Sequence, residues 1–208
     1  MNFLAHFFLS GDDPALMAGN FLADFISNRE VNELPVEVQR GIVLHRQIDH
    51  YTDSHAAVRQ SIQRLYPRHR KYAPVLVDVY YDYFLVHNWA EYTTEDFSSF
   101  RQKAYAALHQ YLPSMSAIMQ KRVQGMVEAD WLRSYGLYEG LEYTFMRMKS
   151  RTSMPEHLDG AVETLKAFRE EMDEEFRWFF PEVLGFVRDV FPMNHDTNHD
   201  TTHDTTHD

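Results

Sequence analysis

The sequence contains no cysteine among its 208 residues. A disulfide framework, a thiolate zinc site and a cysteine nucleophile are therefore excluded. The sequence also has no apolar run with the length of a membrane span, and its opening stretch MNFLAHFFLS lacks the basic region that begins a signal peptide. We therefore expect no signal peptide, no membrane association and a cytoplasmic location.

Basic residues are few relative to acidic ones: 20 Lys and Arg stand against 31 Asp and Glu, a formal net charge of −11. This balance argues against non-specific binding to nucleic acid or to an anionic membrane. Part of the acidity belongs to residues 194–208, NHDTNHDTTHDTTHD, which contain no apolar side chain. We expect a disordered low-complexity tail over residues 192–208. Weak metal binding by the tail is the less favoured alternative.

Apolar side chains are plentiful, with 15 Phe and 12 Tyr, and the length suffices for one domain with a sizeable core. Strand-like alternation is scarce, and most segments show helical spacing. The predicted helices cover residues 2–9, 13–26, 35–51, 53–65, 73–89, 94–112, 113–136, 138–150 and 155–191, the last broken or kinked at Pro181. The predicted caps are Asp13, Asp53 or Ser54, and Thr93 with Asp96. The fold class is an irregular all-α bundle, a single domain over residues 1–191.

Polar residues one helical turn apart interrupt the apolar faces of four of these helices. In GIVLHRQIDHYTD (41–53), His45 and Asp49 fall on the same face as the isoleucines rather than with the solvent-facing Arg46. The other pairs are Asn2 with His6, Asn20 with Asp24, and Asp78 with Asp82. A carboxylate buried without a partner costs several kcal/mol or more. Such groups therefore need one another, a cation or a metal.

Convergence of these pairs would create a ligand set of carboxylate and imidazole groups without sulfur. That set suits a hard or borderline divalent ion, and helical bundles build metal sites from such pairs on facing helices. Each pair alone is weak evidence, because a lone buried histidine usually belongs to the core and an aspartate near a helix end is usually a cap. The repetition over several helices favours a metal site.

Five segments of the chain also carry motifs of a known family: MNFLAH (1–6), GNFLADF (19–25), GIVLHRQIDHYTD (41–53), APVLVDVYYDYFL (73–85) and NW (88–89). They resemble the acyl carrier protein phosphodiesterases, also called holo-acyl-carrier-protein hydrolases. The resemblance is dense over residues 1–90 and continues more loosely through WLRSYG (131–136) to about residue 191. This family is regarded as an atypical, all-α branch of the HD phosphohydrolase superfamily.

The resemblance implies hydrolysis of the phosphodiester that joins 4′-phosphopantetheine to a serine of acyl carrier protein, which leaves apo-acyl carrier protein and free 4′-phosphopantetheine. It implies Mn²⁺ as cofactor, with Mg²⁺, Fe²⁺ or Co²⁺ as alternatives. Ordinary HD domains contain an adjacent His-Asp pair, which residues 1–191 lack. Because His45 and Asp49 stand four positions apart, the carboxylate that completes the His45 site is left open.

A bound divalent ion lowers the pKa of its water and neutralises charge that develops on phosphoryl oxygens. The expected metal ligands are Asp24, His45, Asp49, Asp78 and Asp82. His6 is a further ligand or a general acid or base, and Asp24 and His45 also take part in catalysis. Arg46 is expected to clamp phosphate oxygens or else to be a solvated surface arginine. Asn2, Asn20 and Asp53 are expected to support the ligands or to hydrogen-bond the backbone, and Asp53 is equally well a simple cap.

The stretch RLYPRHRKY (64–72) concentrates positive charge in an acidic protein. Such a patch can steer an acidic partner such as acyl carrier protein, although a solvated loop explains it equally well. The expected contact residues are Arg59, Arg64, Arg68, Arg70 and Lys71. Two other functions remain open: an HD-like phosphohydrolase for a nucleotide or another small phosphoester, and a non-catalytic helical binding protein whose buried acids form a structural network.

Overall fold

Helices provide the regular structure of residues 1–191, the part of the chain that the computed structural model describes. No strand occurs within these residues, so the predicted all-α class is confirmed. The predicted tail at residues 192–208 lies outside the described residues. None of the helices in the described part combines the length and the apolar character that a bilayer crossing requires.

The helices vary in length from one turn to six. In the first half of the chain they are α1 (Phe3–Leu9), α2 (Pro14–Leu22), α3 (Asn28–Val31), α4 (Val36–Ser54), α5 (Ala56–His69), the 3-10 turn η1 (Arg70–Tyr72) and α6 (Ala73–His87). In the second half they are α7 (Trp89–Tyr92), α8 (Phe97–Gln110), η2 (Leu112–Ser114), α9 (Ala117–Glu128), α10 (Trp131–Ser134), α11 (Tyr138–Lys149), η3 (Pro155–Leu158), α12 (Ala161–Ala167) and α13 (Arg169–Val190).

Of the three predicted helix caps, Asp13 is present as expected and the other two differ. The predicted capping box of Thr93 with Asp96 is wrong: α8 begins at Phe97 with Asp96 as its cap, and the Thr93 hydroxyl accepts the N–H of Glu95. Asp13 accepts hydrogen bonds from the first-turn N–H groups of α2, and Asp96 does the same for α8. The prediction that Asp53 or Ser54 caps α5 is wrong. Helix α4 continues through both residues, and His55 Nδ1 accepts the N–H of Ala57 instead.

The predicted helix 113–136 is also wrong, because Asp130 adopts a left-handed conformation with φ 45° between α9 and α10. Gly160, with φ 66°, similarly separates η3 from α12, so the predicted helix 155–191 is divided. Pro181 does not end α13, which runs through it to Val190. The buried face of α13 that contains Phe180 and Val183 outweighs the one backbone hydrogen bond that proline removes.

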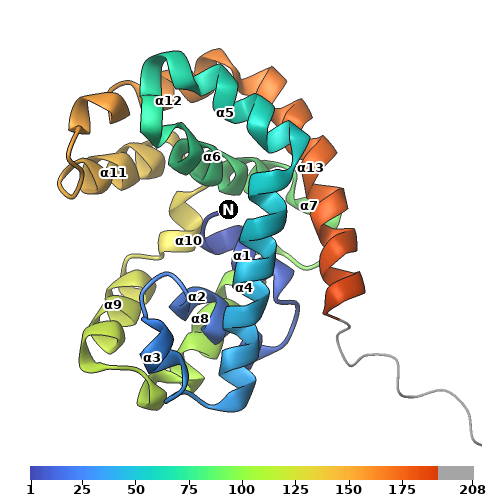
Figure 1. Ribbon diagram of the computed structural model, residues 1–208, viewed down its shortest axis with the longest axis vertical. Coiled ribbons are helices and arrows are strands. Elements are labelled where there is room, and N and C mark those ends of the chain that lie inside the picture. Colours follow the sequence, from blue (N-terminus) through green and yellow to red (C-terminus); the bar gives the residue numbers. More distant parts are fainter. Residues whose placement is uncertain (192–208) are drawn as a thin grey trace, which may run out of the picture.

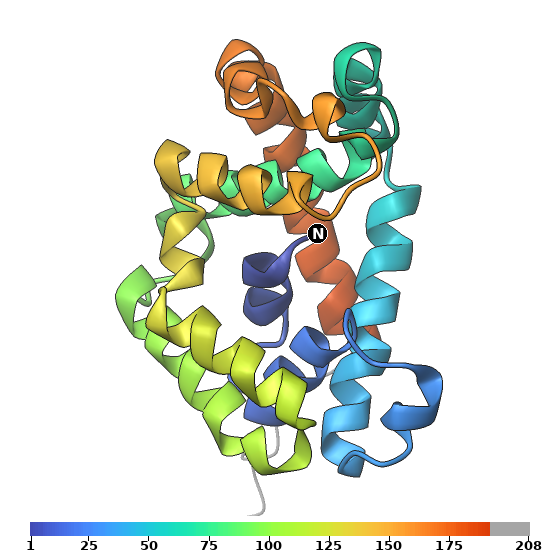
Figure 2. The same ribbon diagram turned by 90° about the vertical axis from the view of Figure 1, so that its left-hand side faces the viewer.

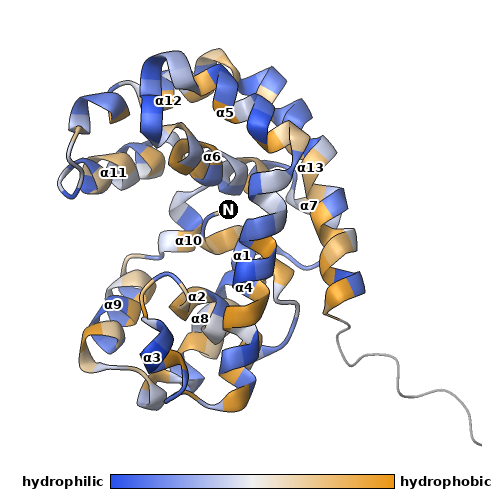
Figure 3. Cartoon of the chain, in the orientation of Figure 1, coloured by the Kyte–Doolittle hydropathy of each residue, from blue (hydrophilic) through white to orange (hydrophobic). Residues whose placement is uncertain are grey.

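Helix α6 crosses the middle of the molecule, with α5 on one side and α1 on the other (Figure 1). It is buried on nearly every face, as its run of apolar and aromatic residues predicts. Helix α1, dark blue in Figure 2, lies inside the molecule between α4 and α10. Helix α13 packs on α4, α5 and α6, and Figure 3 shows apolar and polar residues alternating along it, as in a helix with one buried face.

Helices α2 and α4 approach unusually closely because two glycines meet at their crossing. A Cβ on Gly19 would lie 2.0 Å from the carbonyl oxygen of Val38, and a Cβ on Gly41 would lie 2.5 Å from that of Leu16. No other residue type fits without separating the helices. This contact positions the part of α2 that carries Asn20 against the part of α4 that carries His45.

Candidate metal centre

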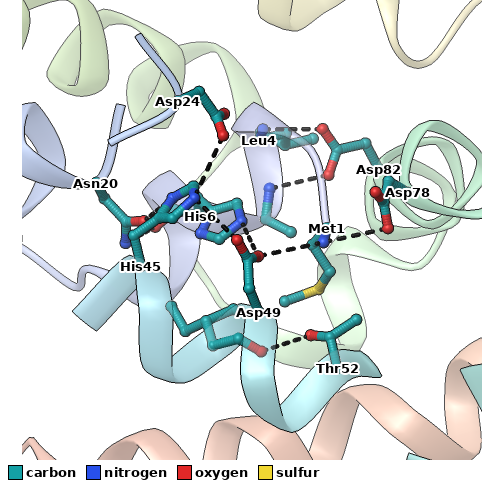
Figure 4. A network of polar contacts seen from close by, with 12 residues as sticks. Met1, Leu4, His6, Asn20, Asp24, His45, Asp49, Thr52, Asp78 and Asp82 are labelled. Carbon is teal, nitrogen blue, oxygen red and sulfur yellow. Dashed lines mark hydrogen bonds and ion pairs between the residues drawn. The ribbon is translucent and has the colours of Figure 1, made fainter. Parts of the chain in front are cut away.

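Three side chains with ligand atoms meet between α1 and α4. His6 comes from α1, His45 and Asp49 come from α4, and one nitrogen or oxygen of each lies within 4.8 Å of the others (Figure 4). His45 Nε2 lies 2.9 Å from Asp49 Oδ2 and 3.3 Å from Asp24 Oδ1. The two imidazole rings stack with their centroids 4.2 Å apart. The structure therefore brings four of the predicted site residues into one cluster.

The orientation of His45 is set by Asn20. The Asn20 Nδ2 group donates to the carbonyl oxygen of His6 at 3.1 Å and to Ser10 Oγ at 2.9 Å, which turns the amide oxygen toward His45 Nδ1 at 3.1 Å. Because that oxygen only accepts, Nδ1 carries the proton and Nε2 faces the two aspartates. Metal-binding histidines are commonly held in this way, with one ring nitrogen donating to a neighbour and the other left for the ion.

The two histidines differ in charge. Burial lowers the pKa of His6 to about 4 against the opposing effect of Asp49, so its ring is neutral. His6 Nε2 lies 3.2 Å from Asp49 Oδ1, yet both ring nitrogens lack a partner with hydrogen-bond geometry. Burial also lowers the pKa of His45, but hydrogen bonds and charge from Asp24 and Asp49 outweigh it and raise that pKa to about 9. A divalent cation would compensate the same carboxylates and release this proton.

Asp78 lies at the edge of the cluster and faces a positive charge. Its Oδ1 is 3.2 Å from the amino group of Met1, which is 3.8 Å from Asp49 Oδ1. Burial lowers the pKa of that amino group, but the two aspartates outweigh burial and raise it. The space between Asp49 and Asp78 therefore attracts a cation.

Asp82 is fully buried but serves another purpose (Figure 4). Its carboxylate accepts the backbone N–H groups of Leu4 at 2.9 Å and Ala5 at 3.0 Å. These groups belong to the first turn of α1 and have no acceptor within the helix. Burial raises the pKa of Asp82 to about 7 despite both bonds. The structure therefore does not bring Asp82 to the histidines; from α6 it caps the helix that carries His6.

The three remaining residues predicted near the centre lie around it. Arg46 is exposed, and its Nη2 donates to Asn28 Oδ1 at 2.6 Å. Asn2 precedes α1 without capping it through its side chain, and it lines a cavity together with Asp78. Asp53 is exposed on the last turn of α4.

The predicted basic stretch lies along the C-terminal half of α5 and in η1. Arg64 is paired with the buried Glu175 of α13 at 2.5 Å, and Lys71 Nζ donates to Ser153 Oγ at 2.8 Å. The other three expected contact residues, all exposed, are Arg68 and Arg70 of this stretch and Arg59, earlier on α5. Within residues 1–191, no hydrogen bond or ion pair of these five side chains reaches His6, His45 or Asp49.

A second group of arginines near the centre was not predicted from the sequence. Arg122, Arg147 and Arg151 line a cavity of about 320 Å³ beside Asn2 and Asp78. They come from α9, α11 and the turn after α11. No motif joins them in the sequence, so only the fold reveals their proximity.

An all-α fold that gathers imidazole and carboxylate groups from several helices defines a helical protein with a candidate divalent-metal centre. The family model described as acyl carrier protein phosphodiesterase matches residues 1–183. The chain belongs to this family, which confirms the resemblance seen in its motifs.

Curated relatives carry the same description. The acyl carrier protein phosphodiesterase of Klebsiella pneumoniae subsp. pneumoniae is 28% identical over 185 residues, which cover 88% of this chain and 96% of that protein. The one from Yersinia pestis is 26% identical over the same coverage. No solved structure matches the chain.

Proposed function

We propose that the protein hydrolyses the phosphodiester between 4′-phosphopantetheine and the serine of acyl carrier protein. In this reaction the oxygen of a water bonds to phosphorus, the bond from phosphorus to the serine oxygen breaks, and that oxygen takes up a proton. The products are apo-acyl carrier protein and 4′-phosphopantetheine. Family membership supports this substrate and this reaction. The chemistry is supported by one observation: ligand atoms of His6, His45 and Asp49 lie close enough together to bind a single metal ion.

The donor set fits a divalent metal ion. His6 is neutral and has two unpartnered ring nitrogens, and His45 offers Nε2 while Asn20 holds Nδ1. These two histidines and Asp49 would hold the ion, with Asp24 next to them. When bound, such an ion stabilises negative charge on phosphoryl oxygens and supplies a water of lowered pKa. Mn²⁺ suits imidazole and carboxylate ligands, as do Mg²⁺, Fe²⁺ and Co²⁺ to differing degrees.

The protein supplies orientation and a proton acceptor. Asn20 fixes the ring of His45, and the cap that Asp82 provides fixes the helix that carries His6. The side chain of Asp24 is 45% exposed, so it reaches both solvent and His45 Nε2. With Asp49 assigned to the ion, we assign to Asp24 the role of the carboxylate that takes a proton from the incoming water.

Mass spectrometry tests the proposal. A holo-acyl carrier protein incubated with the protein and Mn²⁺ should lose the mass of its 4′-phosphopantetheine group. The Asp49→Asn and His45→Gln variants should lose metal binding and hydrolysis together. Gly125→Ala is the matched control, because a Cβ at Gly125 meets nothing within 4 Å. If the mass of the carrier protein stayed unchanged with each of the four ions, the proposed reaction would be contradicted. If hydrolysis were as fast with a chelator as with Mn²⁺, the proposed metal dependence would be contradicted.

A further inference from the structure

The cavity of about 320 Å³ reaches Asp78, at the edge of the candidate metal centre. The side chain of Asp78 lines the cavity, and its Oδ1 contacts the Met1 amino group that also faces Asp49. The volume falls at the lower end of the range for small-molecule sites. A substrate whose reacting group lies at the centre therefore has room to extend into this cavity.

The walls of the cavity are mostly apolar and aromatic. Phe3 and Phe25 stack with their ring centroids 5.7 Å apart, and Trp131 lies 6.5 Å from Phe3. Tyr143, 53% exposed, stands on the α11 side. Such walls suit an extended chain that has apolar groups and few charges.

The same cavity holds three positive charges in a protein with a net charge of −11. The guanidinium carbon of Arg122 lies 4.2 Å from the ring centroid of Phe25, and that of Arg147 lies 4.6 Å from Trp131. Stacked in this way, a guanidinium keeps its N–H edges free for a planar, bidentate acceptor. Within residues 1–191 neither these two nor Arg151 forms an ion pair, and Asp78 is the one carboxylate in the lining.

The three arginines also repel one another. Burial, and after it the charges of Arg151 and Arg147, lower the pKa of Arg122. An anion bound among them relieves this repulsion. Arg122 stacks on Phe25, the residue that directly follows Asp24 in the chain.

We propose that this cavity binds the 4′-phosphopantetheine arm of the substrate. Its phosphate would lie where the cavity borders the candidate metal centre, with Arg122, Arg147 and Arg151 facing it from the cavity side and the aromatic walls along the pantetheine chain. The inference rests on the proposed function and adds the residues that recognise the arm. The basic stretch 64–72 fits this role less well, since Arg64 is already neutralised by Glu175.

Calorimetric titration of the full chain with two probes tests the proposal. The probes are free 4′-phosphopantetheine and pantetheine, which lacks the phosphate, each titrated in a chelator and again with Mn²⁺. The Arg122→Gln and Arg147→Gln variants should bind 4′-phosphopantetheine at least tenfold more weakly and pantetheine almost unchanged. The Tyr143→Ala variant should weaken the binding of both probes. The control is Arg133→Gln, an exposed arginine on the neighbouring α10 that does not line the cavity.

Two results would overturn the inference while leaving the hydrolysis intact. One is equal affinity of the wild-type protein and both arginine variants for 4′-phosphopantetheine. The other is an increased KM for holo-acyl carrier protein with unchanged binding of the free arm, which would assign the arginines to the carrier protein instead. Tight, arginine-dependent binding of the arm without any hydrolysis would support the cavity assignment and contradict the proposed function.

Discussion

Asn20 connects the two histidines of the candidate metal centre although it neither titrates nor carries charge. Through one amide it contacts the backbone of His6, the hydroxyl of Ser10 and the ring of His45. The Asn20→Ala variant should therefore bind Mn²⁺ about 10–100-fold more weakly, the range typical for residues that orient a ligand. Competition with a metal-binding dye measures this. Ser10→Ala is the control, since it removes a bond of the same network that does not reach His45; equal losses in both variants would contradict the orienting role.

For individual residues, the spacing of polar side chains in the sequence predicts part of the candidate site. The spacing of His45 and Asp49 predicts a pair on one face of a helix, and α4 confirms it. Asn20 and Asp24 also both contact His45, but the predicted helix 13–26 is wrong at its end: α2 stops at Leu22, and Asp24 lies in the turn that follows. The sequence could not show that the Asp82 side chain caps α1 instead of joining the histidines, because this contact depends on how α6 packs against the start of α1. Arg122 and Arg147 could not be paired either, since helical periodicity says nothing about contacts between helices.

Among the elements, the crossing of α2 and α4 depends most strongly on residue size. The Gly41→Ala variant would push a Cβ against the backbone of Leu16. We expect destabilisation by about 1–3 kcal/mol or more, together with weaker Mn²⁺ binding, because α4 carries His45 and Asp49. Urea denaturation and metal titration measure both effects. Gly125→Ala on α9 is the control, and it should be neutral or stabilise by up to about 1 kcal/mol; similar behaviour of the two variants would refute the close crossing.

The cap that Asp82 provides for α1 should contribute to both stability and metal binding. Replacing Asp82 with Asn keeps one acceptor but turns an NH₂ group toward a backbone N–H. The expected loss of stability is about 1–3 kcal/mol, and Mn²⁺ affinity should fall because His6 moves with α1. Asp96→Ala removes a cap of α8 that is exposed to solvent. It should cost about 1 kcal/mol and leave metal binding unchanged. Full metal affinity in Asp82→Asn would show that α1 holds its position without this cap.

Local sequence signals predicted helix starts better than helix interruptions. Asp13 and Asp96 cap their own helices, so their effect is encoded within four residues. The left-handed Asp130 breaks the predicted helix where no glycine or proline marks an end, and α13 continues through Pro181, a residue that disfavours a helix interior. In both cases packing with distant segments outweighs a local cost of a few kcal/mol.

For the whole molecule, His69 joins α5 to the C-terminal third of the chain. It is buried, and its ring contacts the carbonyl of His157 at 2.7 Å and Thr164 Oγ1 at 2.9 Å. Burial lowers the pKa of His69 below its value in the unfolded chain. The unfolded chain therefore binds a proton first as the pH falls, so the stabilisation is complete above about pH 6.5 and is lost below it.

Denaturation at pH 7.5 and pH 5.5 measures this contribution. The wild-type protein should lose more unfolding free energy between the two pH values than the His69→Gln variant, by at most about 1.4 kcal/mol per pH unit for one proton. The control is His50→Gln, an exposed histidine on α4. An identical pH dependence in the wild-type protein and His69→Gln would exclude the buried histidine as its source.

The ion pair between Arg64 and Glu175 has a consequence for biosynthesis. Ser61, on the same helix as Arg64, also donates a hydrogen bond to Glu175. Ser61 and Glu175 are 114 positions apart in the chain. At ribosomal rates of about 5–20 residues per second, α5 emerges roughly 6–23 s before its partner in α13. During that interval the apolar faces of α5 and α6 have no cover from the last helix. A nascent chain stalled before α13 should therefore recruit chaperones, and slower growth at low temperature should favour a higher yield of folded protein.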